Sequence, residues 1–280
     1  MTYATALLHL DSHARMNERA DFALRLARKF DSHLVGVASA DRNLFELSVA
    51  TGFAGTVPLA AALEDSRAAA LDRARQFSDR AAAVQLESFE AVVDDRDEID
   101  ALVGRSLCAD LLIVAQPDPL WPDHARARNQ LEQVILHSVA PTLVLPCAGQ
   151  FTDIGAHVLV AWNGSPEAAR AVVGAMPLLQ RARKVNLVRC DTPIDAERAD
   201  DLALLTLPGD WLRRHGVHVD AWIEATEIDV GNALLSRAAD LGADMLVMGA
   251  WGHPRWTERM LGGATRTLLA SMTVPVLMAH

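Results

Sequence analysis

The sequence lacks the features of several protein classes. Its three cysteines, Cys108, Cys147 and Cys190, have neither the paired spacing of a disulfide framework nor that of a zinc ribbon, so each is expected to be a small core residue. Its 26 lysines and arginines against 36 aspartates and glutamates give a net charge of -10, which makes nucleic acid an unexpected partner. No apolar run approaches the ~20 residues that span a bilayer, and no secretory signal opens the chain. We therefore expect no membrane segment and a cytoplasmic protein.

What the sequence does contain is an internal repeat. Residues 109–115, ADLLIVA, match residues 243–249, ADMLVMG, and APTLVL at 140–145 matches VPVLMA at 274–279. Both matches have an offset of 134 residues. A constant offset over two apolar runs, with a helical pattern between them, indicates two copies of one domain.

The repeat predicts two domains, residues 1–150 and residues 151–280. Their first strands, near 6–11 and 158–163, align at an offset of 152 rather than 134, which places roughly 18 extra residues in copy one. We assign this insertion to residues 41–62, where glycines and a proline interrupt any period. It is expected to be a loop or short helical excursion, serving either as a lid or as a packed surface flap.

Strand-type runs alternate with helical periodicity in each copy. In copy one the expected strands lie near 4–10, 33–39, 85–93, 110–115 and 141–146, and the helices near 14–30, 63–83, 97–107 and 126–138. In copy two the strands lie near 157–162, 184–190, 217–224, 243–248 and 274–279, and the helices near 166–181, 197–215, 229–240 and 262–271. This alternation predicts an α/β protein of two tandem Rossmann-like domains, each a doubly wound five-stranded parallel sheet.

The strongest candidate site follows the fourth strand of copy two. The apolar run 243–248 leads into the segment GAWGHPRWTERMLGGATRTLL and then into a helical pattern. A glycine loop that opens onto a helix N-terminus offers free N–H groups and the positive end of the helix dipole, which suit a phosphate. The matching loop of copy one, residues 116–128, has three prolines and no glycine, so we expect no nucleotide there.

These glycines carry a resemblance to the universal stress protein family. The family's nucleotide signature is glycine, two residues, glycine, nine residues, then glycine followed by serine or threonine. Gly249, Gly252 and Gly262 have this spacing, whereas Gly263 replaces the hydroxyl residue. Asn163-Gly164-Ser165 resembles the family's Asp-Gly-Ser turn, with an amide in place of the carboxylate. The chain thus resembles a tandem universal stress protein whose nucleotide signature survives in copy two.

The resemblance implies a stress-response protein that binds an adenine nucleotide, ATP with or without Mg, in copy two. The residues it places around that ligand are Asn163, Val188, Met248, Gly249, Gly252, Gly262, Gly263, Ala264 and Thr265. In this family the closing strands pair between two domains about a twofold axis. The tandem chain is therefore expected to form an intramolecular pseudo-dimer, with a homodimer left open and protein partners unknown.

Three functions remain open from the sequence. The first is a nucleotide-regulated interaction module, and the second is a nucleotide-independent interaction or small-ligand module in which the glycine loop is structural. The third is a slow ATPase or adenylate-processing enzyme. Because the chain has no phosphate loop ending in Lys-Ser or Lys-Thr, no nucleophile elbow and no convincing metal-ligand set among its ten histidines, we expect a binding module without a metal site.

Overall fold

The computed structural model describes residues 2–40, 56–191, 202–251 and 263–280, without the side chains of 56–60 and 202–204. Most of the predicted insertion, together with Gly252 and Gly262 of the glycine loop, lies outside these described residues. The elements that hold the candidate sites are all within them.

The first half of the chain contains five strands and four helices in the described ranges. They are β1 (Thr5–His9), α1 (Met16–Phe30), β2 (His33–Ser39), α3 (Thr56–Ala83), β3 (Phe89–Asp94), α4 (Glu98–Ser106), β4 (Leu111–Ala115), α5 (His124–His137) and β5 (Thr142–Leu145). The predicted elements are present, and most of their boundaries agree within two or three residues. The expected helix 63–83 begins earlier, at Thr56, so residues 56–62 of the predicted insertion belong to this long helix rather than to a separate excursion.

The second half repeats the same order in its described residues. Its elements are β6 (His157–Ala161), α6 (Pro166–Leu179), β7 (Lys184–Asp191), α8 (Leu202–Arg214), β8 (Val219–Ala225), α9 (Val230–Leu241), β9 (Met245–Gly249), α10 (Gly263–Ser271) and β10 (Val276–Ala279). The paired residues Leu34 and Phe89 of β2 and β3 are 55 positions apart, whereas Val185 and Val219 of β7 and β8 are 34 apart. The extra residues of copy one therefore lie between its second and third strands, as expected.

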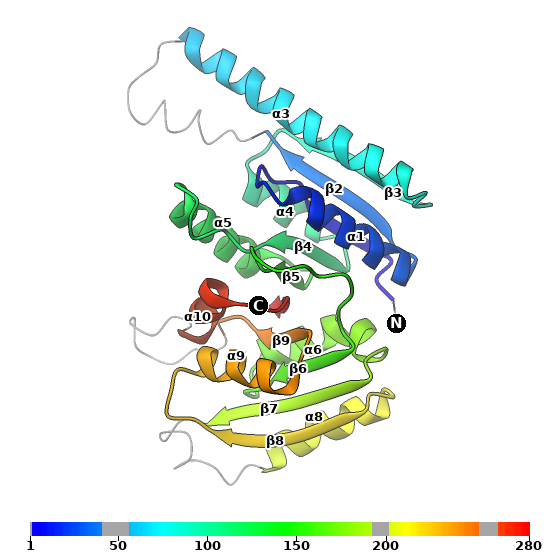
Figure 1. Ribbon diagram of the computed structural model, residues 1–280, viewed down its shortest axis with the longest axis vertical. Coiled ribbons are helices and arrows are strands. Elements are labelled where there is room, and N and C mark those ends of the chain that lie inside the picture. Colours follow the sequence, from blue (N-terminus) through cyan, green and yellow to red (C-terminus); the bar gives the residue numbers. More distant parts are fainter. Residues whose placement is uncertain (1, 41–55, 192–201, 252–262) are drawn as a thin grey trace.

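All ten strands form one sheet, in the order β3-β2-β1-β4-β5-β10-β9-β6-β7-β8. Pairing is parallel within each half, and the predicted α/β architecture of two Rossmann-like halves is confirmed. The two halves join where β5 and β10 pair antiparallel, which makes the sheet continuous along the length of the molecule (Figure 1). Each closing strand thereby covers the edge of the other.

The junction has approximate twofold symmetry. Leu143 of β5 pairs with Leu277 of β10, and these two residues are 134 positions apart, the offset of the repeat. Val144 pairs with Val276 on one side of them. Because equivalent residues face each other, the pseudo-symmetry axis passes through the Leu143–Leu277 pair, and the chain forms the intramolecular pseudo-dimer that the resemblance implied.

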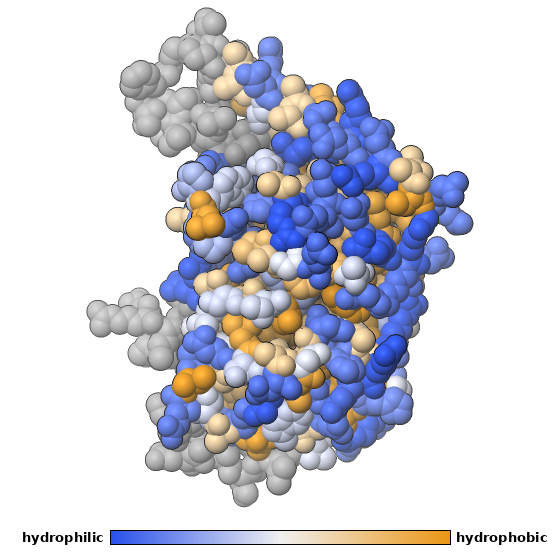
Figure 2. Space-filling model, viewed as in Figure 1, coloured by the Kyte–Doolittle hydropathy of each residue, from blue (hydrophilic) through white to orange (hydrophobic). Residues whose placement is uncertain are grey.

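Helices cover both faces of the sheet. Successive strand residues point to opposite faces, so Leu8 belongs to the core layer covered by α1, α3, α6 and α8, whereas Leu7 belongs to the layer covered by α4, α5, α9 and α10. In the described ranges, no helix combines the length and apolar character required to cross a bilayer. The face in Figure 2 is largely hydrophilic, with small apolar patches between charged side chains.

Candidate functional site

The topology creates one crevice in each half, at the carboxyl ends of the strands. After β1 the chain enters α1 on one face of the sheet, and after the neighbouring strand β4 it enters α5 on the other face. The same reversal occurs between β6 and β9. Ligands of open α/β sheets bind at such switch points, so each of the two crevices is a candidate binding site.

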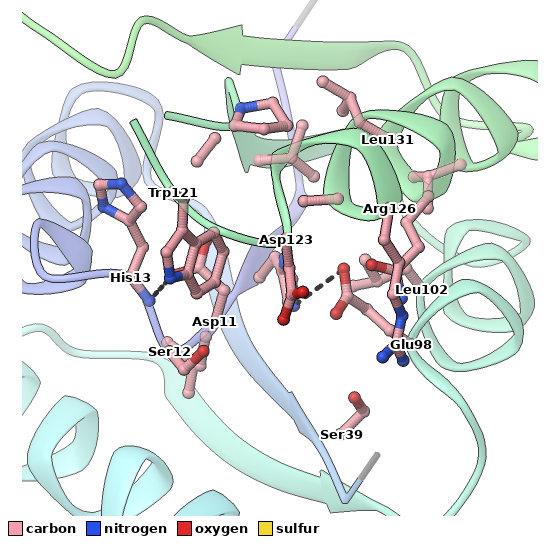
Figure 3. Close-up of a pocket in the computed structure, with 18 of the residues that line it drawn as sticks. Asp11, Ser12, His13, Ser39, Glu98, Leu102, Trp121, Asp123, Arg126 and Leu131 are labelled. Carbon is pink, nitrogen blue, oxygen red and sulfur yellow. Dashed lines mark hydrogen bonds and ion pairs between the residues drawn. The ribbon is translucent and has the colours of Figure 1, made fainter. Parts of the chain in front are cut away.

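In copy one the crevice holds a cavity of about 330 Å³. Its walls come from the segment after β1, the end of β2, helix α3, helix α4, and the connection from β4 into α5. Figure 3 shows Asp11, Ser12 and His13 on one side of this space and Glu98, Leu102 and Arg126 on the other. The sequence predicted no nucleotide here, and these side chains come from segments too far apart for any motif to group them.

Local capping interactions set the polar side chains of this cavity in place. The Asp11 carboxylate accepts a hydrogen bond from the N–H of His13 at 2.9 Å, which forms a turn after β1. Asp97 caps α4 by accepting from the N–H of Asp100 at 2.9 Å, and this puts Glu98 at the first helical position, beside the strand ends. Hydrogen bonds to the backbone thus fix the position of Asp11 and of the first turn of α4 in the cavity wall.

Arg73 reaches from α3 across the strand ends. Its guanidinium donates to the carbonyl oxygens of Leu10 at 2.9 Å and Ser39 at 3.2 Å. Burial lowers the pKa of Arg73, and the nearby charges of Asp11 and Glu98 oppose that change. The arginine therefore joins β1, β2 and α3 and contributes one positive charge to the cavity wall.

Two histidines of copy one lie beside carboxylates. His9 Nε2 is 3.7 Å from Glu98 Oε1, and His13 Nε2 is 3.7 Å from Asp118 Oδ2. The ring centroids of His13 and Trp121 are 5.8 Å apart, edge to face, so the indole is held at the mouth of the cavity. Each histidine side chain is 9% exposed, so both rings are held in place within the wall.

In copy two, four of the residues predicted to contact the nucleotide lie at or near the carboxyl ends of β6, β7 and β9. Asn163 is exposed, and its side-chain oxygen accepts from the N–H of Ser165 at 3.1 Å. Val188 is fully buried and Met248 is 6% exposed, both in the core under α9 and α10. Their role toward a ligand remains a prediction.

Gly249 has a packing role that the glycine spacing did not reveal. A Cβ on this residue would lie 2.4 Å from the backbone nitrogen of Ala168 and 2.6 Å from the carbonyl carbon of Glu167, both in the first turn of α6. Such distances are far below van der Waals contact. The missing side chain therefore lets α6 approach the end of β9.

The first turn of α10 contains Gly263, Ala264 and Thr265. Gly263 is exposed, and the Asp229 carboxylate lies 3.7 Å from the position that its Cβ would occupy. Thr265 is 2% exposed, and its hydroxyl oxygen accepts from the N–H of Trp251 at 3.3 Å. The threonine hydroxyl thus points into the protein, and the exposed groups of this turn are those of the two smaller residues.

Residues 156–280 match the model of the universal stress protein family. A universal stress protein from Archaeoglobus fulgidus DSM 4304 has a TM-score of 0.68 at 15% identity, over 98% of this chain and 95% of that one. A functionally unknown protein from Pseudomonas aeruginosa PAO1 gives 0.59 at 15% identity, over 98% and 92%. No curated protein matches. At these identities the solved structures establish the shared fold of the whole chain.

Proposed function

We propose that the protein, whose residues 156–280 match the model of the universal stress protein family, is a stress-response protein whose second half binds ATP in the crevice between β6 and β9. The observation that carries the proposal is the spacing of Gly249, Gly252 and Gly262 between a strand at the switch point and the N-terminus of α10. The free N–H groups of that first turn suit phosphate oxygens.

Asp229 favours ATP bound together with Mg. Its Oδ1 caps α9 by accepting from the N–H of Asn232 at 3.1 Å, and its Oδ2 faces Gly263. A lone carboxylate beside the phosphate site would repel free ATP, whereas carboxylates and phosphates together are suitable ligands for Mg²⁺. We therefore expect Mg²⁺ to strengthen nucleotide binding at this site.

Contact between α10 and copy one supports a role as a nucleotide-regulated interaction module. Gln116, at the end of β4, donates from Nε2 to the carbonyl oxygen of Leu269 at 2.9 Å. Leu269 lies in the last turn of α10, where carbonyl groups lack helical partners. One short helix therefore extends from the proposed phosphate site to the other half of the molecule, and a nucleotide that orders its first turn acts on an element shared by both halves.

Melting experiments on the full chain test ATP binding. A nucleotide at about a hundred times its dissociation constant should stabilise the protein by roughly 2.7 kcal/mol. We expect a clear rise in the melting temperature with millimolar Mg-ATP, a smaller rise with ATP and EDTA, and little change for Gly262→Val. Asp229→Asn keeps a good helix cap and should reduce the difference between ATP with and without Mg. Equal melting with and without nucleotide, under both conditions, would rule out the proposal.

A second candidate function is favoured by the cavity in copy one, namely a small-ligand module that works without nucleotide. Turnover of radiolabelled ATP distinguishes both binding modules from a slow ATPase. We expect no more than slow hydrolysis, because the proposal assigns no catalytic base to the ATP site. Rapid turnover that Gly262→Val abolishes would assign enzymatic activity to the second half.

A further inference from the structure

We infer that the cavity of copy one is a second binding site, whose ligand is an uncharged, hydroxyl-rich molecule of the size of a monosaccharide or disaccharide. This inference develops the small-ligand candidate and is independent of ATP binding in copy two. The volume of about 330 Å³ falls within the ~300 to 1,000 Å³ typical of small-molecule sites. The cavity also lies at the switch point between β1 and β4.

The charges around the cavity are already balanced, which favours an uncharged ligand. Asp11 forms an ion pair with Arg19, behind the wall. Glu98 lies beside His9, and its charge also acts on Arg73. A ligand with a net charge would disturb this balance, whereas hydroxyl groups can donate to the carboxylates and accept from the guanidinium groups.

Charges of opposite sign also lie at the start of α5, on the edge of the cavity. Asp123 and Arg126, at the start of α5, add one charge of each sign to the lining. The Asp123 carboxylate makes no capping hydrogen bond to α5, so it can accept from a ligand. The two oxygens of a carboxylate lie side by side, which matches the neighbouring hydroxyl groups of a sugar.

Two mostly buried polar side chains line the wall. Ser39 and His9 are each 7% exposed, and both line the cavity. The separation of 3.7 Å between His9 Nε2 and Glu98 Oε1 exceeds a hydrogen bond. A hydroxyl group and an imidazole in the wall can each exchange hydrogen bonds with a polar ligand.

The remaining lining suits the apolar face of a sugar ring. Leu102, Leu131 and Val134 lie between α4 and α5, and Trp121 stands at the mouth, 37% exposed. The backbone N–H of Trp121 donates to the carbonyl oxygen of Asp118 at 3.0 Å, and the indole itself lies edge to face with the His13 ring. Indole faces provide large, rigid contact areas at low entropic cost, and the C–H face of a sugar can stack on them.

A phosphate fits this cavity poorly. The connection from β4 to α5 has three prolines and no glycine, so its backbone cannot form the glycine loop expected in copy two. Asp11, Glu98 and Asp123 would face the phosphate oxygens. The two halves of the chain are therefore expected to bind ligands of different chemistry.

Saturation-transfer NMR on the full chain, with saturating Mg-ATP present, tests the inference. The probes are a panel of neutral pentoses, hexoses and disaccharides, and the best of them is then compared with its amino and phosphate derivatives. We expect a neutral sugar to bind with ATP present, and each charged derivative to bind more weakly. Trp121→Ala should weaken binding about tenfold, and Trp121→Phe should retain most of it.

Leu120→Ala is the matched control, because Leu120 is 91% exposed and lies next to Trp121 without lining the cavity. It should leave sugar binding unchanged. The inference is overturned if no sugar of the panel binds, if a charged derivative binds more tightly than its parent, if Leu120→Ala has the effect of Trp121→Ala, or if ATP displaces the sugar competitively. A protein that binds sugar but not ATP would refute the proposed function alone.

Discussion

Replacement of Gly249 by alanine separates a packing role for this glycine from a purely ligand-binding one. The added Cβ would meet backbone atoms of α6 at 2.4 and 2.6 Å, so a side-chain rotation cannot relieve the clash. Overpacking in a core costs ~1 to 3 kcal/mol, and a clash with backbone belongs at the upper end of that range. We expect Gly249→Ala to lower the free energy of unfolding by about 3 kcal/mol, without any nucleotide present.

Gly209→Ala is the matched comparison for this variant. Gly209 lies within α8, and the nearest atom to its added Cβ would be Arg213 Nη1 at 3.5 Å, an ordinary contact with the end of a flexible side chain. Alanine is favoured over glycine inside a helix by about 1 kcal/mol, so this variant should be as stable as the wild type or slightly more stable. Urea denaturation followed by circular dichroism measures both. Equal stability of Gly249→Ala and the wild type would refute the packing argument.

Three further substitutions test particular contacts. The Arg96 guanidinium donates two hydrogen bonds to Asp94, its backbone N–H donates a third, and together they lower the pKa of that carboxyl group. The stability this provides is present above the unfolded pKa of about 3.9 and is lost as pH falls toward the folded pKa. Asp94→Asn should therefore be less stable at pH 7 and lose less stability on acidification, as measured by urea denaturation at a series of pH values; an unchanged acid dependence would contradict this. Gln116→Leu leaves a buried carbonyl of α10 without its partner and should cost about 1 to 3 kcal/mol, whereas an unchanged melting curve would argue against the bridge. Tyr3→Phe removes a hydroxyl that donates to a carbonyl oxygen of α6 at 2.8 Å and should cost about 1 kcal/mol in the same assay; a stabilised variant would show that this bond between the halves is unfavourable.

Hydrophobic periodicity predicted the architecture because the spacing of buried residues within each strand or helix is visible in the sequence. The two closing strands, for example, are short apolar runs with a common offset, and their pairing follows from the need to cover two sheet edges. The start of α3 was placed too late, since glycines and a proline near residues 52–58 interrupt the pattern and boundaries depend on more than periodicity.

Side-chain environments were less accessible from the sequence. The glycine spacing singled out Gly249 as a residue of the nucleotide site, but it gave no sign that helix α6 occupies the room a side chain would need there. The hydrogen bond that the Thr265 hydroxyl accepts from the backbone of Trp251 could not be read from the sequence, and its role near phosphates stays a prediction. The cavity of copy one could not be predicted at all, because its walls come from five separate segments that only the fold brings together.

Because both halves belong to one chain, the two sides of the junction at the Leu143–Leu277 pair do not need to carry the same residues. In a dimer of identical subunits every substitution at the interface occurs twice, and each must tolerate its own copy. Here Gln116 bonds across to α10, whereas its counterpart 134 residues later, Ala250, has no side chain able to return that bond. A single mutation can therefore change one half of the junction and leave the other as it was.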